Sequence, residues 1–388
     1  MIIGIDARFA VWNRRGIGNY TLELIRHLAQ IDQCNKYILY VDRDDIERIL
    51  PRQINFETKK ISPRNYLIWE QVMLPFHAWK DKVNVLHSTG NTAPIHLNKE
   101  IKLAVTIHDI SYLKSYDEVP KSPHFYQRLG RIYRKFFVTQ AVQVLNAVIT
   151  VSEFAKNDIL FKFPSITKDK FYVTYLAINS KFEPINREKA KKNVEIKYQI
   201  KSNYLLTVGG RDPQKNTSLL IETFLELKQQ SKVKQELVLI VVGISELLGK
   251  KMVTKMMQNS DFNKDIIFIS YASQNDLLFL YNAAELFIFP SFYESFGLPP
   301  LEAMACGTPV ITSSTGAIPE VVGNAAYLIN PRKGEDLKEA ITKLLNDQSL
   351  KNELIRCGLE RVKVLSWQKM AQTTLSIYQS IVKNENFS

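Results

Sequence analysis

Two glutamates lie in one segment, FPSFYESFGLPPLEAMACGTPVIT, which spans residues 289–312. Glu294 precedes a predicted helix, and Glu302, eight positions later, belongs to the first turn of that helix. A single glutamate in a first helical turn is commonly only a partner for the positive end of the helix dipole. Two carboxylates beside one helix N-terminus, however, are suited to accept hydrogen bonds from the hydroxyl groups of a ligand. The segment therefore predicts a site for a hydroxyl-rich molecule.

The helix that positions these carboxylates is predicted from its prolines and glycines. Pro299 and Pro300 suit a first turn because they lack an N–H group that would be unpaired there, and Gly307 suits the residue after a helix end. We expect the helix to run from about Pro300 to Cys306. Its N-terminus directs free N–H groups at the preceding loop, where Gly297 lets a ligand approach the backbone closely. This loop is therefore a predicted anion site.

A second group of polar residues follows a predicted strand in LLTVGGRDPQKN, residues 205–216. Arg211 and Lys215 lie at the carboxyl end of this strand, which is the edge where open parallel sheets bind ligands. A planar guanidinium and a compact ammonium are both suited to neutralise a diphosphate. The alternative is that both are solvated loop charges, which contribute little. We expect Lys215 to contact phosphate, and we place Arg211 beside it.

Further candidates lie in the first half of the chain. His108 ends the run KLAVTIHD, residues 102–109, and so also lies at the carboxyl end of a predicted strand. A histidine at such a place is more often packed than catalytic. Gly16 and Gly18 open a predicted helix after the first strand, but a third glycine and a later acidic partner are missing. A nicotinamide enzyme is therefore disfavoured.

The elements that must position these residues follow an α/β pattern, because short Val- and Ile-rich runs alternate with stretches of helical period. We predict two doubly wound Rossmann-like domains with a cleft between them, at whose strand ends ligands bind. The first comprises residues 1–184, with a helix at 366–388 packing back on it, and the second comprises 200–365. The polar stretch 185–203 is the predicted junction. The predicted strands span 2–6, 37–41, 83–88, 102–109, 147–152, 203–210, 236–243, 265–271, 286–291 and 308–313.

The composition indicates which kinds of partner and which cell compartment are favoured. The 51 Lys and Arg against 39 Asp and Glu give a net charge of +12, and residues 1–180 alone carry 25 against 17. Such a balance favours an anionic partner, and the lack of any recognised nucleic-acid module argues against DNA or RNA. Three cysteines without CxxC spacing predict neither a disulfide framework nor a zinc site, and we expect the cytoplasm. We expect no signal peptide, no membrane span and no metal.

The segment that holds the two glutamates resembles the signature of the retaining family-4 glycosyltransferases of the GT-B fold. That pattern reads Glu, Gly, Phe, Gly, Leu, Pro and then a second Glu eight positions after the first. The resemblance extends over nearly the whole chain. It implies that Glu294 is a catalytic residue that contacts the donor sugar, and that amides around Phe296, Gly297 and Leu298 hold sugar or phosphate. It implies that Glu302 binds the ribose hydroxyls of a nucleotide.

The same resemblance gives roles to the other candidates. It implies that His108 is catalytic and contacts the donor sugar near the reacting carbon, and that Gly16 and Gly18 lie near the donor phosphates and the acceptor. The family commonly has an arginine five residues before the lysine of the second group. Here Arg211 lies four residues before Lys215, so the arginine is displaced by one position. We assign both to the donor diphosphate, and the reaction then requires neither a metal nor a cofactor.

The runs IWEQVMLP (68–75) and TIHDISYL (106–113) resemble polysaccharide mannosyltransferases. The implied function is transfer of a hexose, with retention of configuration, in O-antigen-type polysaccharide biosynthesis. The implied donor is GDP-mannose, and the implied acceptor is a glycan, carried for example on a polyprenyl diphosphate. The basic first domain predicts a peripheral contact with the cytoplasmic face of the inner membrane. A transferase that uses a UDP- or dTDP-sugar is the alternative within the same class.

Two departures leave other classes open. The family usually has glycine where this chain has Ser295, and its arginine is displaced as described. These differences are compatible with a non-catalytic sugar-nucleotide-binding protein that has kept the site and lost turnover. An epimerase on a similar two-domain scaffold is a third hypothesis, and it would need carboxylates able to move a proton on the sugar ring.

Overall fold

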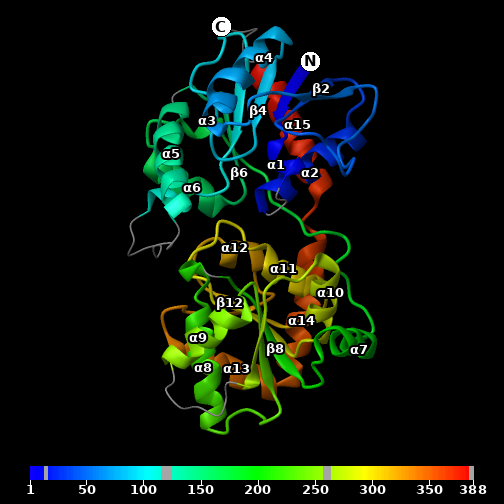
Figure 1. The fold of residues 1–388 in the computed structure, drawn as a ribbon, viewed down its shortest axis with the longest axis vertical. Coiled ribbons are helices and arrows are strands. Elements are labelled where there is room, and N and C mark those ends of the chain that lie inside the picture. The colour runs from blue at the N-terminus through cyan, green and yellow to red at the C-terminus, as the bar shows by residue number, and fades with distance from the viewer. Residues whose placement is uncertain (13–15, 115–124, 143, 211, 257–263, 384–388) are drawn as a thin grey trace. The chain divides into compact units, whose positions relative to one another are not determined.

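The computed structural model describes residues 1–12, 16–114, 125–142, 144–210, 212–256 and 264–383, and they divide into two compact units (Figure 1). Unit 1 takes in Met1–Lys114, Pro123–Leu176 and Ser366–Ser388, and unit 2 takes in Ala177–Leu365, as far as the described residues reach. Each unit has its own parallel sheet and its own hydrophobic core.

Unit 1 is built on a parallel sheet of seven described strands in the order β3-β2-β1-β4-β5-β6-β7. The inner strands are rich in Val, Ile and Leu and are buried along nearly their whole length, as expected for a parallel sheet covered by helices on both faces. The strands are β1(Ile2–Asp6), β2(Lys36–Val41), β3(Phe56–Lys60), β4(Val85–Ser88), β5(Lys102–Thr106), β6(Ala147–Thr150) and β7(Phe171–Val173). Chain order reverses between β1 and β4.

Helices cover this sheet, and one of them comes from the far end of the chain. In Figure 1, α15 (red) lies against α2 (blue), and the two helices pack together. The buried residues of α15 include Met370, Ile377 and Tyr378. The helical elements are α1(Arg8–Val11), α2(Gly16–Ile31), α3(Tyr66–Ile68), the π-helical turn η1(Trp69–Met73), α4(Leu74–Lys80), the 3-10 turn η2(Ser111–Leu113), α5(Phe125–Ala141), α6(Glu153–Lys162), the 3-10 turn η3(Lys168–Lys170) and α15(Trp367–Lys383).

Unit 2 repeats the plan with a parallel sheet of six described strands in the order β10-β9-β8-β11-β12-β13. Chain order reverses beside β8, so the ends of β8 and β11 form the place where such a sheet binds ligands. The strands are β8(Tyr204–Val208), β9(Val238–Val242), β10(Ile266–Ile269), β11(Leu286–Phe289), β12(Val310–Ser313) and β13(Tyr327–Ile329). The helical elements are α7(Arg187–Tyr198), the 3-10 turn η4(Pro213–Lys215), α8(Thr217–Gln229), α9(Glu246–Met256), α10(Gln274–Ala283), α11(Leu298–Ala305), α12(Ile318–Val322), α13(Gly334–Asn346) and α14(Gln348–Lys363).

The predicted fold class is confirmed, since both units are α/β with parallel, doubly wound sheets. The sequence pattern does not predict β3, β7 and β13, and each of these strands is at the edge of its sheet. The edge strand β3 has the sequence FETKK and is mostly exposed, and β7 and β13 have three residues each. Edge strands need no continuous apolar run, so their signal is weak.

The polar stretch 185–203, predicted as the junction between the two domains, belongs to unit 2 in the structure. It contains α7, which packs against α10 inside unit 2. Asn186 begins this helix by accepting a hydrogen bond from the backbone N–H of Lys189 at 2.9 Å. Only Ala190 and Val194 of α7 are buried, so the helix shows little apolar periodicity. The division between the units lies instead at Leu176–Ala177.

Candidate functional site

The predicted site residues that the structure describes lie in loops at the carboxyl ends of strands or in the helical elements that follow these loops. We call the two places the unit 1 edge and the unit 2 edge. At the unit 2 edge, Lys215 of η4 follows β8 and Glu294 follows β11. The Lys215 Nζ lies 2.6 Å from the Glu294 Oε1, and the two side chains are 27% and 13% exposed. The ammonium also lies 5.2 Å from the ring centre of Phe289. The two predicted ligand contacts therefore form an ion pair with each other.

Hydrogen bonds hold η4 against the loop after β11. The buried Ser291 hydroxyl lies 2.8 Å from Glu294 Oε1 and 2.9 Å from the backbone carbonyl of Gln214. The backbone N–H of Phe292 donates to the same carbonyl at 2.8 Å, and the Gln214 side-chain amide donates to the carbonyl of Tyr293. These bonds set the distance between Lys215 and Glu294.

A third loop, after β12, fixes the backbone of Glu294. The Ala317 N–H donates to the Glu294 carbonyl at 2.9 Å. Gly316 has a φ of +67°, and a Cβ atom there would lie 2.7 Å from the Glu294 carbonyl oxygen and 2.9 Å from its nitrogen. Only glycine fits this position without moving Glu294.

The N-terminus of α11 lies in the same loop system. The helix begins at Leu298 and ends at Ala305, two residues earlier at its start than predicted, with Gly297 as the preceding residue at a φ of +101°. A Cβ atom on Gly297 would lie 2.5 Å from Ile318 Cδ1, so both the backbone and the packing require glycine. Because Pro299 and Pro300 carry no N–H group, the amides of Gly297 and Leu298 are the donors that this N-terminus offers.

Glu302 lies further along α11 and has a different partner. The hydroxyl of Tyr281, on α10, donates to Glu302 Oε2 at 3.0 Å. Burial raises the pKa of Glu302 to about 7, although the Tyr281 hydrogen bond lowers it in part. Glu302 therefore titrates near neutral pH, and its ionised form is the one that accepts hydrogen bonds through both oxygens.

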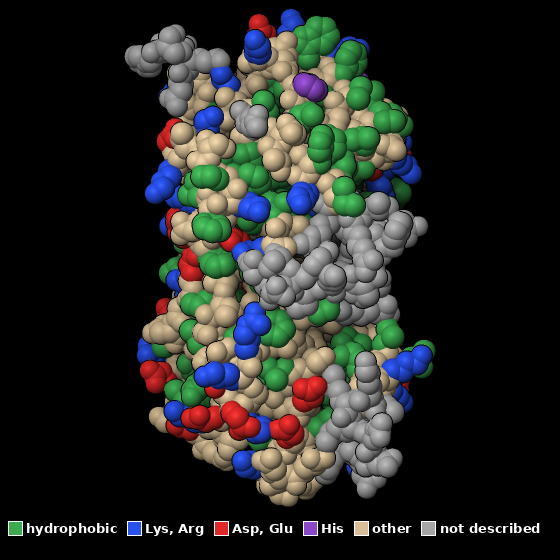
Figure 2. Space-filling model, turned by 90° about the vertical axis from the view of Figure 1, so that its left-hand side faces the viewer, with side chains coloured by type: hydrophobic (Ala, Val, Ile, Leu, Met, Phe, Trp, Pro, Cys, Tyr) green, Lys and Arg blue, Asp and Glu red, His purple; other side chains and the backbone are tan. Residues whose placement is uncertain are grey.

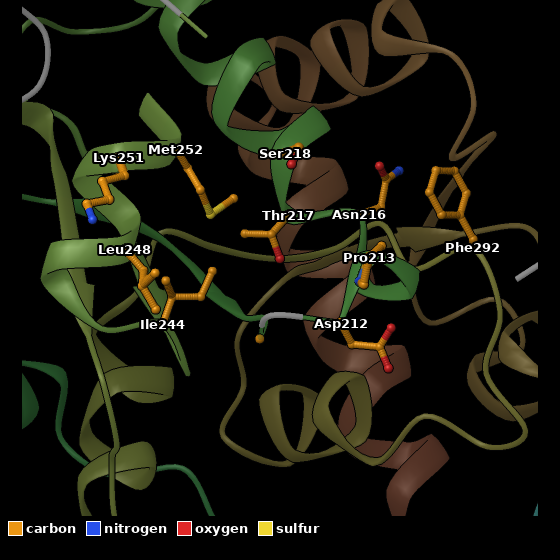
Figure 3. Close-up of a pocket in the computed structure, with 11 residues that line it drawn as sticks. Asp212, Pro213, Asn216, Thr217, Ser218, Ile244, Leu248, Lys251, Met252 and Phe292 are labelled. Carbon is orange, nitrogen blue, oxygen red and sulfur yellow. The ribbon is translucent and has the colours of Figure 1, made fainter. Parts of the chain in front are cut away.

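A pocket of about 540 Å³ lies beside the loop after β8 (Figure 3). Ile244, Leu248 and Met252 form its apolar side, and Thr217 and Pro213 face them. None of the described residues that line it is Lys215, Glu294 or Glu302. The pocket shares the loop that leads to η4. Arg211, the predicted second cation of that loop, lies outside the described residues.

The unit 1 edge holds His108, which follows β5 and is buried. Its Nε2 lies 2.9 Å from the backbone carbonyl of Thr89, so Nε2 carries the proton and donates. Burial lowers the pKa of His108, partly offset by the Thr89 carbonyl and by the charge of Asp109. The ring is therefore neutral at physiological pH, and its Nδ1 is left as a hydrogen-bond acceptor.

The first turns of α2 lie beside this histidine. Gly16 is exposed, and a Cβ atom there would meet nothing within 4 Å, whereas Gly18 is buried. Two residues later, the Tyr20 ring contacts the His108 ring edge-on, with centroids 4.7 Å apart. The structure thus brings Gly16, Gly18 and His108 to one edge of unit 1.

A buried chain of hydrogen bonds extends from Tyr20 to α15. The Tyr20 and Thr106 hydroxyls lie 2.9 Å apart, Thr106 lies 2.8 Å from His87 Nε2, and His87 Nδ1 lies 2.6 Å from the Tyr378 hydroxyl. Burial lowers the pKa of His87 to about 3, so this imidazole is neutral as well. The surroundings of His108 are therefore joined to the C-terminal helix without any charge.

Sequence reasoning did not find Ser291, Gln214, Gly316, Ala317 and Tyr281, which hold the candidate residues. Each of them makes a contact with a residue distant in sequence. Ser291 and Gln214 lie within the two segments quoted above, but neither segment shows that they contact each other. In the described part of the chain no group of three or more His, Cys, Asp or Glu side chains could hold a metal ion. No helix among the described residues is both long and apolar enough to cross a bilayer.

Comparisons with known proteins cover almost the whole chain. The family model described as "Glycosyltransferase Family 4" matches residues 14–182, and the one described as "Glycosyl transferases group 1" matches residues 188–361. Among curated proteins, the "O-antigen chain mannosyltransferase B" of Escherichia coli is 28% identical, over 94% of this chain and 96% of its own.

Solved structures show the same fold. WaaG, "a glycosyltransferase involved in lipopolysaccharide biosynthesis", matches with a TM-score of 0.72 and 15% identity, over 97% of this chain and 99% of its own. Anabaena Alr3699/HepE "in complex with UDP-glucose" matches with a TM-score of 0.69 and 16% identity, over 99% of each chain. These likenesses establish the two-domain GT-B fold.

Proposed function

We propose, from the premise that this chain belongs to glycosyltransferase family 4 and has the GT-B fold, that it transfers mannose from GDP-mannose to a glycan acceptor with retention of configuration. The acceptor is a lipid-linked or other oligosaccharide of O-antigen-type polysaccharide biosynthesis. The choice of sugar and pathway is supported by the mannosyltransferase of Escherichia coli, and the UDP-glucose complex of HepE makes a UDP-sugar the main alternative.

The observation that carries this proposal is the meeting of Lys215, Glu294 and the start of α11 at one edge of unit 2. In the proposed complex, Lys215 and the amides of Phe296, Gly297 and Leu298 bind the donor diphosphate. Arg211 adds a second cation. As the bond between the sugar C1 and the diphosphate breaks, negative charge accumulates on the leaving group, and these fixed donors stabilise it.

The remaining candidates orient the donor. Glu294 accepts hydrogen bonds from the sugar hydroxyls, and Glu302 accepts them from the ribose. The neutral Nδ1 of His108 accepts a hydrogen bond from the sugar, and the first turn of α2, with Gly16 and Gly18, lies near the phosphates. The acceptor oxygen bonds to C1 while its proton passes to a phosphate oxygen of the leaving diphosphate. This route needs no metal ion and no protein nucleophile.

A peripheral contact of unit 1 with the cytoplasmic face of the membrane is part of the proposal. Exposed large apolar side chains include Leu67, Val72, Phe76 and Trp79 on the segment from α3 to α4, and Phe136 on α5. On the face drawn in Figure 2, hydrophobic side chains gather near the upper end with Lys and Arg around them. Aromatic and basic groups together suit an anionic lipid surface. The basic residues Arg128 and Arg131 of α5 lie outside the described side chains.

The test is a transfer assay with GDP-mannose, UDP-glucose and dTDP-glucose as separate donors, with a polyprenyl-diphosphate oligosaccharide as acceptor, with and without EDTA. We expect nucleotide release coupled to acceptor elongation with GDP-mannose, unaffected by EDTA and lost in Glu294→Ala. Elongation with another donor would correct the sugar or base. Binding of the donor without elongation would favour the non-catalytic alternative, and recovery of the donor with an inverted sugar centre would favour an epimerase.

A further inference from the structure

The two groups assigned to the diphosphate and to the sugar form an ion pair with each other. Lys215 Nζ and the Ser291 hydroxyl both contact Glu294 Oε1, at 2.6 and 2.8 Å. The other carboxylate oxygen, Oε2, has no hydrogen-bond partner in the part of the chain that the structure describes. One oxygen is thus occupied by protein groups, and the second is available to a ligand.

A diphosphate that binds at Lys215 competes with Glu294 for the ammonium. Where it draws the ammonium away, the carboxylate of Glu294 keeps only the Ser291 hydroxyl on Oε1, and its side chain is 13% exposed. A largely desolvated carboxylate that loses its cation is costly, and the incoming phosphate charge adds repulsion. The cost is offset only when the ligand itself brings hydrogen-bond donors to Glu294.

We infer that Glu294, through its pair with Lys215, discriminates a nucleoside diphosphate that carries its sugar from one that has lost it. This inference rests on the proposed function. The sugar hydroxyls of the donor donate hydrogen bonds to the Glu294 carboxylate and so replace its lost ion pair. The free nucleoside diphosphate binds Lys215 but offers Glu294 no hydrogen-bond donor. Glu294 therefore determines specificity between donor and spent nucleotide, and it favours release of the product after transfer.

The experiment measures the dissociation constants of GDP and GDP-mannose, or of UDP and UDP-glucose if the protein prefers uridine, by calorimetry on the wild type and on Glu294→Gln. We expect the variant to bind the free diphosphate about tenfold tighter, a change comparable to the free energy of a partly buried ion pair. The sugar nucleotide should bind no tighter than in the wild type. Product inhibition by the free diphosphate should strengthen by the same factor.

Two further variants show whether the tighter diphosphate binding depends on the ion pair between Lys215 and Glu294. In the Lys215→Met background, Glu294→Gln should tighten diphosphate binding by clearly less than in the wild type, because no ammonium remains to be released and only the direct charge repulsion is relieved. Glu302→Gln is the matched control, since it also replaces a glutamate of the same site but one that contacts Tyr281 instead of Lys215. We expect Glu302→Gln not to tighten diphosphate binding. Glu294→Ala should tighten it as Glu294→Gln does, and so serves if the glutamine variant fails to fold.

The outcomes separate this inference from the proposed function. A wild type that binds the diphosphate and transfers sugar, together with Glu294 variants that bind the diphosphate equally or more weakly, would overturn the inference alone. Equal tightening by Glu302→Gln, or tightening that persists undiminished in the Lys215→Met background, would also overturn it, because the effect would then be a general loss of negative charge. A wild type that binds neither nucleotide would overturn the proposed function and the inference with it.

Discussion

At the unit 2 edge an ammonium and a carboxylate contact each other at 2.6 Å, whereas the unit 1 edge presents a neutral imidazole bonded to a backbone carbonyl at 2.9 Å. The unit 2 groups are partly exposed and are held by loops that hydrogen bond to one another. The unit 1 group is buried against the Tyr20 ring and the Thr89 carbonyl. The difference indicates that the two edges contribute differently, with charge complementarity in unit 2 and shape and hydrogen-bond direction in unit 1.

Unit 1 does carry charges near its edge, but they are paired internally. Arg8 lies 2.7 Å from Asp6 and 3.2 Å from Glu70, with its guanidinium 3.8 Å from the ring centre of Trp69. All three charged side chains are nearly fully buried. Breaking such a pair would leave an uncompensated buried charge, so this group holds α1 and η1 together and is not available to a ligand.

The largest effect is expected for Lys215→Met at the unit 2 edge. Loss of one preorganised cation at the leaving diphosphate should reduce transfer by about 1,000-fold and weaken binding of the free nucleoside diphosphate. Steady-state kinetics and calorimetry measure both. Lys251→Met, which removes an exposed lysine of α9, is the matched control and should be neutral. Equal losses in the two variants would mean that net charge, and not the Lys215 position, governs binding.

A different pattern is expected for His108→Ala at the unit 1 edge. The loss of an oriented acceptor should reduce kcat by about 100-fold. The affinity for the free nucleoside diphosphate should be unchanged, because the proposed contact is with the sugar. Since burial lowers the pKa of His108, protonation of this residue should reduce the wild-type rate only at a lower pH than expected for an exposed histidine. A His108 variant that loses diphosphate affinity would remove the contrast between the edges.

Glu302→Gln removes a charge at the unit 2 edge, and its effect should appear in the free energy of unfolding. The folded-state pKa of about 7 lies above the value of 4.5 for an unperturbed glutamate, so the native state binds the extra proton between these values. Wild-type stability should therefore fall as pH rises from 4.5 to 7, and Glu302→Gln should be more stable than the wild type by about 2 kcal/mol at pH 8. Denaturant unfolding at pH 4.5 and pH 8 measures this. A constant difference between the two pH values would contradict it.

The smallest effect is expected for Tyr378→Phe, which removes a neutral hydrogen bond to His87 in unit 1. We expect a loss of about 1 kcal/mol in the free energy of unfolding, with no dependence on pH between 5 and 8 because His87 stays neutral. Tyr271→Phe, at a tyrosine that is 81% exposed, is the matched control and should leave stability unchanged. A marked pH dependence of the Tyr378→Phe effect would show that His87 becomes charged in this pH range, contrary to the neutral hydrogen-bond chain described for unit 1.

The contrast between the edges is only partly readable from sequence. The buried strands of both sheets and the position of α11 follow from Val- and Ile-rich runs and from Pro299, Pro300 and Gly307, because these residues have strong local preferences. The ion pair of Lys215 with Glu294 joins residues 79 positions apart and depends on the Ser291 and Gln214 hydrogen bonds. The neutral tautomer of His108 depends on the Thr89 carbonyl. Such contacts leave no periodic or compositional signal.

The return of the chain from unit 2 to unit 1 at residue 366 has a consequence for biosynthesis. A ribosome finishes every strand and helix of unit 2 before it makes α15, so unit 2 has all its parts while unit 1 still lacks the helix that covers α2 and supplies Tyr378 to His87. A nascent chain interrupted after residue 365 would then carry a complete second lobe and an unfinished first one. Unit 1 can therefore complete its fold only at the end of synthesis, when residues translated almost two hundred codons after the rest of this unit become available.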